Sequence, residues 1–160
     1  METGVGSSRN LLYYPENVNI TAIDWAKNVL ELALAKPMND VIQIEYKMDD
    51  CEKMSFDEDV FDCVVDTFGL QYCQDPEKVI NEMKRVCKKN GKILLLETGR
   101  SFYDAYNVFL ELTNPFYIFH YGYFENRPWE EIIQKSGLEV ELKERKVNGT
   151  IYFYVLKNMK

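Results

Sequence analysis

Glu2-Thr3-Gly4-Val5-Gly6 is the stretch that decides the fold, together with the β-branched run Val18-Asn19-Ile20-Thr21-Ala22-Ile23 and the acid that ends it, Asp24. Two glycines one residue apart allow positive φ angles and let a ligand approach main-chain NH groups without an intervening Cβ. The β-branched run predicts a buried strand, and an acid at the tip of such a strand is placed to accept hydrogen bonds from ribose hydroxyls. The stretch therefore predicts half of a nucleoside-binding site.

Two charged residues narrow the kind of ligand. The third glycine of a dinucleotide fingerprint would fall at position 9, which holds Arg9, so a pyrophosphate cradle is disfavoured. Glu2, just before the turn, would repel a phosphate and is suited to face a ligand's ammonium group. From the loop alone, a nucleoside without phosphates and an ordinary glycine turn without a ligand stay open in equal measure.

The composition is that of one globular domain with an acidic balance. The chain has 160 residues, of which 46% are hydrophobic and 28% charged, and it contains no uncharged apolar run long enough to cross a bilayer. A net charge of -7 and a sequence pI near 4.8 oppose binding to a phosphate backbone. We predict a single domain over residues 1–160 and no nucleic-acid partner.

The cysteines indicate a reducing compartment. They have no CxxC spacing and the chain holds one histidine, so neither a zinc site nor a disulfide framework is predicted. We therefore expect no metal and an intracellular location, cytoplasmic or mitochondrial. The four residues are Cys51, Cys63, Cys73 and Cys87.

Strand and helix patterns alternate, which predicts an α/β fold with a Rossmann-like, doubly wound and mostly parallel sheet that ends in an antiparallel β-hairpin. The sequence starts where a first strand should already be running, so we expect a shortened chain with that strand largely missing and the preceding helix absent. Strands are predicted over residues 18–23, 41–48, 61–68, 92–97, 138–146 and 150–157, the last two joined at Asn148-Gly149. Helices are predicted over residues 10–14, 26–35 (ended by Lys36-Pro37), 76–87 (stopped by residues 88–91) and 128–136.

Residues 102–124 are rich in aromatic side chains, and Asn114-Pro115 is predicted to break them into two pieces. Because this segment follows the strand at residues 92–97, it should lie over the carboxyl ends of the strands. It is a candidate cover for an acceptor molecule, and core packing explains many of its rings equally well. Its rings also suit peripheral contact with a membrane surface.

Four polar or glycine-containing segments directly follow predicted strands: Gly4, Asp24, the loop at residues 49–50, and Thr67-Phe68. Ligands of doubly wound sheets bind in the crevice outside the carboxyl ends of the strands. We therefore expect these four segments to meet at one rim.

These residues resemble the class I S-adenosylmethionine-dependent methyltransferases over essentially the whole chain. The glycine loop is similar to that family's cofactor loop, and Asp24 to its ribose-binding acid. Residues 48–56, Met48-Asp49-Asp50-Cys51-Glu52-Lys53-Met54-Ser55-Phe56, resemble the segment G-D-A-E-x-L-P-F of ubiquinone-biosynthesis-type members. Residues 61–97 are similar to the family's fourth strand, following helix and fifth strand.

The end of the chain resembles a membrane-associated subgroup that includes mitochondrial oxidase-assembly-suppressor-type methyltransferases. The residues that carry this likeness are His120-Tyr121-Gly122, Asn126-Arg127, Ser136-Gly137-Leu138 and Gly149-Thr150.

The resemblance implies S-adenosylmethionine as the cofactor and a role for each residue of the rim. Asp24 would bind the ribose, and Trp25 or Met48 would lie against the adenine. Asp50 would accept from the adenine amine and the Cys51 NH would meet a ring nitrogen. Gly4, Gly6, Thr67 and Phe68 would line the methionine part of the cofactor, with Glu2 near its ammonium. A helix cap stays open for Asp24, as does a solvated acidic loop for Asp50.

Methyl transfer needs a protein base only where the acceptor still holds its proton. His120 is the candidate, since a neutral imidazole accepts a proton near pH 7, and a structural histidine is the alternative. Cys73 with His120 as a thiol nucleophile is a minor alternative. Arg127 would bind either an acceptor oxyanion or an acid on its own helix.

We predict S-adenosylmethionine-dependent methyl transfer to a small, hydrophobic or quinone-like acceptor. Two alternatives stay open: a nicotinamide-dependent dehydrogenase, for which Gly4, Gly6 and Asp24 serve equally well, and an inert methyltransferase-like binding module. The sequence leaves the oligomeric state open.

Overall fold

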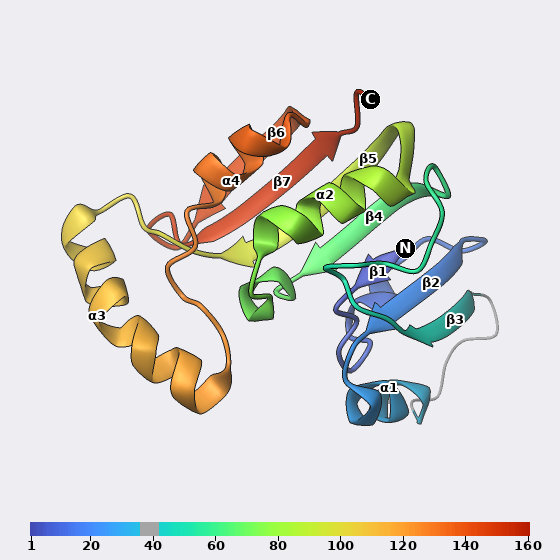
Figure 1. Cartoon of the computed structure of the whole chain (residues 1–160), viewed down its shortest axis with the longest axis horizontal. Coiled ribbons are helices and arrows are strands. Elements are labelled where there is room, and N and C mark those ends of the chain that lie inside the picture. The colour runs from blue at the N-terminus through green and yellow to red at the C-terminus, as the bar shows by residue number, and fades with distance from the viewer. Residues whose placement is uncertain (36–41) are drawn as a thin grey trace.

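One sheet of seven strands, in the order β3-β2-β1-β4-β5-β7-β6, organises the computed structural model, which describes residues 1–35 and 42–160 (Figure 1). The strands are β1 Glu2–Thr3, β2 Asn19–Asp24, β3 Gln43–Met48, β4 Phe61–Thr67, β5 Cys87–Thr98, β6 Glu139–Lys146 and β7 Ile151–Lys157. The helices are α1 Lys27–Leu34, α2 Pro76–Val86, α3 Asp104–Tyr121 and α4 Trp129–Ser136, with 3-10 turns η1 Asn10–Tyr13 and η2 Leu70–Tyr72.

The sheet is mostly parallel, as predicted. Strands β1 to β5 run parallel, and β7 is antiparallel to both β5 and β6. The two-residue strand β1 lies between β2 and β4, where Glu2 is in register with Ala22 and Val65. The amino group of Met1 continues that ladder by donating to the Cys63 carbonyl at 2.8 Å. The expected α/β fold with a very short first strand is thus confirmed.

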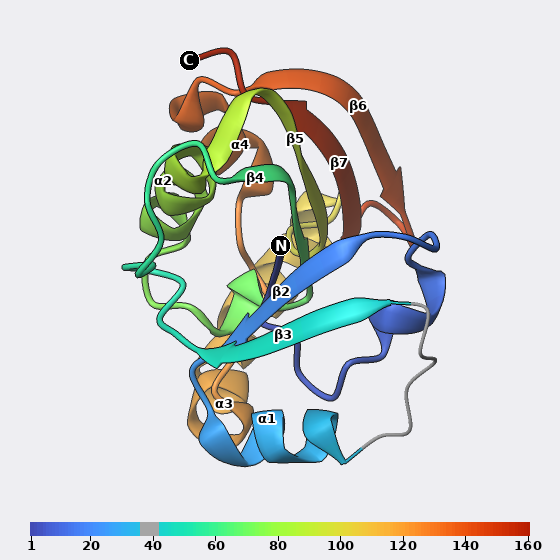
Figure 2. The same ribbon diagram turned by 90° about the vertical axis from the view of Figure 1, so that its right-hand side faces the viewer.

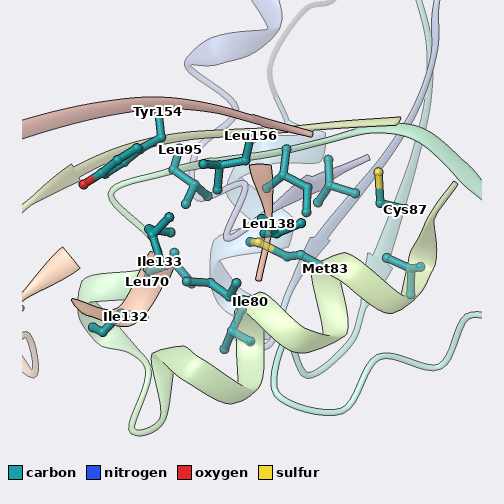
Figure 3. Close-up of a cluster of buried hydrophobic side chains, with 14 of the residues drawn as sticks. Leu70, Ile80, Met83, Cys87, Leu95, Ile132, Ile133, Leu138, Tyr154 and Leu156 are labelled. Carbon is teal, nitrogen blue, oxygen red and sulfur yellow. The ribbon is translucent and has the colours of Figure 1, made fainter. Parts of the chain in front are cut away.

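Two apolar clusters cover opposite faces of the sheet. In β2, Ile20 and Ala22 belong to the cluster beneath η1 and α1, whereas Ile23 belongs to the cluster beneath α2 and α4. This division follows from the two-residue period of a strand, which turns successive side chains to opposite faces. Figure 2 shows α2 and α4 together on one side of the sheet, and Figure 3 shows Ile80 and Met83 of α2 facing the sheet side chains Leu95 and Leu156.

Helix α2 begins as predicted and ends earlier than predicted. The Asp75 carboxylate accepts from the Lys78 NH at 3.0 Å and Pro76 occupies the first turn, a normal N-terminal cap. The helix ends at Val86, one residue before its predicted last residue Cys87, but residues 88–91 already belong to β5. The expected strand start at residue 92 is therefore wrong, because the chain becomes extended at Cys87, which pairs with Phe61 of β4. The Asn158 side chain donates to the Lys84 and Cys87 carbonyls, and so satisfies carbonyls at the end of the helix that residues 88–91 were expected to cap.

Helix α3 runs without interruption through Pro115, so the predicted break at Asn114-Pro115 is wrong. A proline inside a helix removes one NH and crowds the carbonyl of the preceding turn, which usually kinks or ends the helix, yet α3 continues through Pro115. Gly122, in the left-handed conformation, closes the helix by donating to the Tyr117 and Ile118 carbonyls. The Asn114 side chain accepts from the Glu125 NH at 3.0 Å and holds the segment that follows the helix.

The hairpin turn lies where it was predicted. Asn148 and Gly149 both have positive φ, and Gly149 donates to the Lys146 carbonyl at 3.0 Å. Strands β6 and β7 flank this turn. The predicted helix end at Lys36-Pro37 and the predicted strand start at Val41 lie outside the described residues.

Candidate cofactor site

A cavity of about 850 Å³ lies at the carboxyl ends of β1, β2, β3 and β4. Its walls are the loops that follow these four parallel strands, so four separate segments of the chain line it. The structure brings eight of the predicted site residues to this cavity: Gly4, Gly6, Asp24, Trp25, Asp50, Cys51, Thr67 and Phe68. The predicted meeting of the four segments at one rim is therefore observed, and their contacts with a ligand stay a prediction.

The glycine turn after β1 is fastened to the end of β2 by Asp24. Gly4 and Gly6 both have positive φ, 57° and 54°, which suits glycine. The Asp24 carboxylate accepts from the Gly6 NH at 3.1 Å through one oxygen and from the Ala26 NH at 3.0 Å through the other. Each carboxylate oxygen has a second lone pair, so Asp24 keeps acceptor capacity for a hydroxyl in the cavity.

The loop after β3 is shaped by its own acids. Asp49 accepts from the Ser55 NH at 3.0 Å, and Asp50 accepts from the Glu52 NH at 2.8 Å. Asp50 is exposed, and Cys51 beside it is half-buried. These bonds give the loop a tight turn that presents Asp50 and Cys51 on the cavity wall.

The turn after β4 has an unusual backbone. Phe68 has φ 57°, a left-handed conformation that bulky residues seldom adopt and that is common at functional sites. Asp66 stabilises the turn by accepting from the NH groups of Gly69 at 2.8 Å and Leu70 at 3.1 Å. A Cβ on Gly69 would lie 2.7 Å from this carboxylate, so the turn requires glycine there.

The acids Asp66 and Glu97 form a buried pair beneath this turn, which the sequence analysis missed. Burial raises the pKa of Asp66, and burial followed by the charge of Asp66 raises the pKa of Glu97 further. Burial and the neighbouring acid thus favour the protonated form of Glu97, and Thr3 donates its hydroxyl to Asp66 from β1. The sequence does hold an indication of this pair, because each acid lies near the end of a mostly apolar strand, and these strands, β4 and β5, are neighbours in the sheet.

The outer edge of the cavity is aromatic. The Trp25 side chain is 76% exposed although it lines the cavity, so its indole is free to cover a flat ligand. Tyr72 also lines the cavity, and its ring centroid lies 5.7 Å from that of Tyr123. Tyr123 in turn lies 5.4 Å from Tyr117 of α3. A continuous run of rings thus connects the cavity with α3. Met48, the other residue predicted beside the adenine, is exposed and is not part of the cavity lining.

Glu2 is placed differently from the other predicted residues. It is buried and is not part of the cavity lining, and its carboxylate accepts from the Asn10 side chain at 2.9 Å. Burial raises the pKa of Glu2. The side chain faces η1 because the glycine turn begins only after Thr3, so Glu2 still belongs to the strand. A contact between Glu2 and a ligand ammonium stays a prediction that this geometry does not support.

His120 also lies away from the cavity lining. It is exposed on the last turn of α3, with its ring centroid 4.3 Å from that of Phe116. Arg127 does not pair with an acid on its own helix, because its guanidinium stacks 3.8 Å from the Phe124 ring and donates to the Cys73 carbonyl. Burial lowers the pKa of Arg127. The catalytic role of His120 stays a prediction.

Comparison with known proteins places this cavity in a family. Residues 1–95 match the family model described as a methyltransferase domain. The phosphatidylethanolamine N-methyltransferase of Cereibacter sphaeroides is 32% identical over 103 residues, which cover 60% of this chain and 48% of the relative. The mitochondrial methyltransferase OMS1 of Saccharomyces cerevisiae is 27% identical and covers 98% of this chain and 37% of the relative. The demethylmenaquinone methyltransferase of Bacillus subtilis is 32% identical over 103 residues and covers 61% of this chain and 44% of the relative.

These relatives are all longer, and this chain spans about half of their length or less. A solved structure of an S-adenosylmethionine-dependent methyltransferase from Methanosarcina mazei matches 99% of this chain and 91% of its own chain, with a TM-score of 0.78 at 19% identity. The structural match shows the fold. Because the family model covers more than half of the sequence, we conclude that the chain belongs to the class I methyltransferase family, whose cofactor is S-adenosylmethionine.

Proposed function

We propose that the cavity binds S-adenosylmethionine and that the protein transfers its methyl group to a small, hydrophobic, quinone-like acceptor. The observation that carries this proposal is the meeting of four strand-end loops at one cavity in which Asp24 holds the glycine turn.

The residues of the cavity fit the cofactor. A Cβ on Gly4 would lie 3.2 Å from the Cα of Gly69, so the β1 and β4 loops approach each other this closely because Gly4 has no side chain. Asp24 keeps lone pairs for ribose hydroxyls, and Trp25 offers a flat apolar face for the adenine. Asp50, exposed on the same wall, is placed to accept from an amine.

The chemistry asks little of the protein beyond position. When bound, the cofactor supplies a methyl group that its sulfonium has already activated. The four loops then fix the direction of attack and limit access of water, which supply much of the acceleration in a displacement of this kind. Asp66 holds the turn after β4 by accepting from the Gly69 NH. Glu97 is buried beside Asp66, and its pKa is raised.

The acceptor is proposed to lie along the aromatic run from Tyr72 to α3. Flat rings bind flat, apolar molecules through offset or edge-on contacts, and this run starts at the cavity wall. The names of two relatives refer to demethylmenaquinone and to phosphatidylethanolamine. The planar acceptor is the better match for this surface, and a reduced quinone needs a base for its hydroxyl proton, a role that we assign to His120.

The exposed apolar side chains of α3 are also proposed to contact a membrane surface, from which such an acceptor would enter the site. Phe119 is 84% exposed and Leu112 is 76% exposed. Among the residues that the structure describes, no helix is both long and apolar enough to span a bilayer. A cytoplasmic or mitochondrial location stays a prediction.

Cofactor binding is tested by calorimetry with S-adenosylhomocysteine. We expect Asp24→Ala to weaken binding at least tenfold, which corresponds to about 1.4 kcal/mol, because it removes the ribose acceptor and the tether of the glycine turn. Glu31→Ala on α1 is the matched control, since its carboxylate is exposed and pairs with Lys27 at the surface. Binding of NAD instead of S-adenosylhomocysteine, or equal affinity of the two variants, would overturn the cofactor assignment.

The acceptor is tested by transfer of a labelled methyl group in vesicles that contain either a demethylated naphthoquinol or phosphatidylethanolamine. We expect label in the naphthoquinol and a strong loss of rate in His120→Gln, with cofactor affinity unchanged. Label in the lipid amine would replace the quinone assignment, and label in neither acceptor beside tight S-adenosylhomocysteine binding would favour an inert binding module.

A further inference from the structure

Two cysteines from different loops meet on the wall of the cavity. The Sγ atoms of Cys51 and Cys73 lie 3.3 Å apart, and both residues are half-buried and belong to the cavity lining. We propose that this pair forms a reversible intramolecular disulfide under oxidising conditions and that the disulfide weakens cofactor binding. The second half of this inference rests on the proposed cofactor site.

The two loops are already held together by a third residue. One carboxylate oxygen of Glu52 accepts from the NH groups of Gln74 and Asp75, both at 3.1 Å, and the other lies 3.8 Å from the Lys78 ammonium. Glu52 directly follows Cys51, and Gln74 directly follows Cys73. The Glu52 side chain thus ties the loop of Cys51 to the loop of Cys73 and keeps the two residues close to each other.

The geometry needs only a small movement to form the bond. A disulfide has an S–S length of about 2.05 Å, so the two sulfurs must approach by roughly 1 Å from 3.3 Å. Cys51 lies in a loop and Cys73 ends η2, so neither is fixed inside a strand or a long helix. The cavity gives a small oxidant access to both sulfurs.

A hydroperoxide can act as the two-electron oxidant that converts the two thiols into a disulfide. The thiolate of one cysteine attacks the peroxide O–O bond and becomes a sulfenic acid, while an alcohol or water leaves. The second sulfur then displaces the hydroxyl of the sulfenic acid, so a disulfide forms and water leaves. Two electrons pass from the sulfurs to the peroxide, and a dithiol reductant returns them.

The other two cysteines are poor competitors. Cys87 is fully buried, and Cys63 lies outside the cavity that Cys51 and Cys73 line, so neither of these two sulfurs meets an oxidant that enters this cavity. The pKa of Cys73 is raised, chiefly by the hydrogen bond that it shares with Cys51 and then by burial. Cys73 therefore gains its advantage from the adjacent sulfur and not from acidity, and oxidation should need more peroxide than an acidic thiol does.

Disulfide formation changes the cavity because Cys51 lies inside the turn that presents Asp50. The Asp50 side chain accepts from the Glu52 NH at 2.8 Å and its carbonyl accepts from the Lys53 NH at 3.0 Å, so the turn moves as a unit. Pulling Cys51 toward Cys73 changes the position of this turn, which lines the space proposed for the adenine. We expect at least a tenfold loss of affinity for S-adenosylhomocysteine, and by linkage the bound ligand should protect the thiols to the same extent.

The experiment uses the full chain in three states: reduced, treated with hydrogen peroxide, and treated and then reduced again. Peptide mass mapping reads the Cys51–Cys73 link, and calorimetry reads the affinity for S-adenosylhomocysteine. We expect the link and the weaker affinity to appear together and to be reversed together. Cys51→Ser and Cys73→Ser should each abolish the response to peroxide, whereas Cys63→Ser should keep it.

Each result decides a separate point. Absence of the mapped link after peroxide treatment, or a mapped link with unchanged affinity, overturns the inference. Failure of the reduced protein to bind S-adenosylhomocysteine overturns the proposed cofactor site and with it the effect on affinity, while the mass map still shows whether the two sulfurs are joined.

Discussion

Helices α2 and α3 use their apolar side chains in opposite ways. Helix α2 buries one face completely against the sheet and α4, with Val79, Ile80, Met83 and Val86 all at 0% exposure. Helix α3 is longer, with 18 residues, yet Leu110 is its single buried residue. The burial in α2 is explained by the fold alone. The exposed rings of α3 are not, and this difference directs attention to α3 as the surface that meets an acceptor.

The largest expected effect is a loss of stability when an apolar side chain of α2, but not one of α3, is truncated to alanine. Ile80→Ala in α2 should lower the free energy of unfolding by about 2–5 kcal/mol, since it removes a fully buried side chain and leaves a cavity. Leu112→Ala in α3, where the side chain is 76% exposed, should change it by less than about 0.5 kcal/mol. Urea unfolding followed by circular dichroism measures both, and equal losses would remove the distinction between the helices.

A smaller effect is expected at the end of α2. The buried Asn158 side chain donates to the carbonyls of Lys84 at 2.9 Å and Cys87 at 2.8 Å. Asn158→Ala leaves these carbonyls without that donor and should lower the free energy of unfolding by about 1–3 kcal/mol. Asn19→Ala, at an exposed position of β2, is the control and should be nearly neutral. A neutral Asn158→Ala would mean that the helix end does not depend on this side chain.

On α3 the expected effect is on the acceptor and not on stability. The Tyr121 ring is 60% exposed and lies 6.1 Å from the Tyr123 ring. Tyr121→Ala should raise the acceptor KM about two- to tenfold, the equivalent of about 0.5–1.5 kcal/mol for a lost ring contact. The affinity for S-adenosylhomocysteine should not change. Tyr13→Ala is the matched control, because Tyr13 is 85% exposed on η1 and does not line the cofactor cavity. Equal KM values in both variants would argue against α3 as the acceptor surface.

The smallest expected effect is on the pH dependence of stability, and it arises from the buried acids Asp66 and Glu97. The folded-state pKa of Glu97 lies well above its ordinary value of 4.5, so the folded protein binds more protons than the unfolded chain above that pH. Stability must therefore fall as the pH rises from about the ordinary value toward the raised one. Glu97→Gln keeps a donor for Asp66 and cannot ionise, so its melting temperature should fall less across pH 5 to 9 in thermal unfolding. Parallel curves for the two proteins would show that Glu97 does not carry this proton.

The parts of the fold that depend on local sequence could be predicted. The strand at Asn19–Asp24, the capped start of α2 and the turn at Asn148-Gly149 each follow from nearby residues. The start of β5 directly after α2 could not be predicted, because a side chain from the far end of the sequence binds the carbonyls of Lys84 and Cys87 at this junction. The continuity of α3 through Pro115 could not be predicted either, because a proline inside a helical pattern usually ends or kinks the helix.

The candidate site divides in the same way. The rim could be predicted because the carboxyl ends of parallel strands meet at one edge, whatever their spacing in the chain. The pair of Asp66 and Glu97 and the meeting of Cys51 with Cys73 arise only when separate loops pack together, so the distance between their side chains is not written in any local pattern.

The two tryptophans stand in opposite surroundings, which gives the protein two built-in optical probes. Trp129 is 1% exposed and donates its indole NH to the Thr98 carbonyl at 2.7 Å, so its emission should shift to the red only when the domain unfolds. Trp25 is already in contact with water at the mouth of the cavity, so its emission should respond to adenosyl ligands while the fold stays intact. Intrinsic fluorescence of Trp25→Phe and Trp129→Phe can thus separate occupancy from unfolding without any added label.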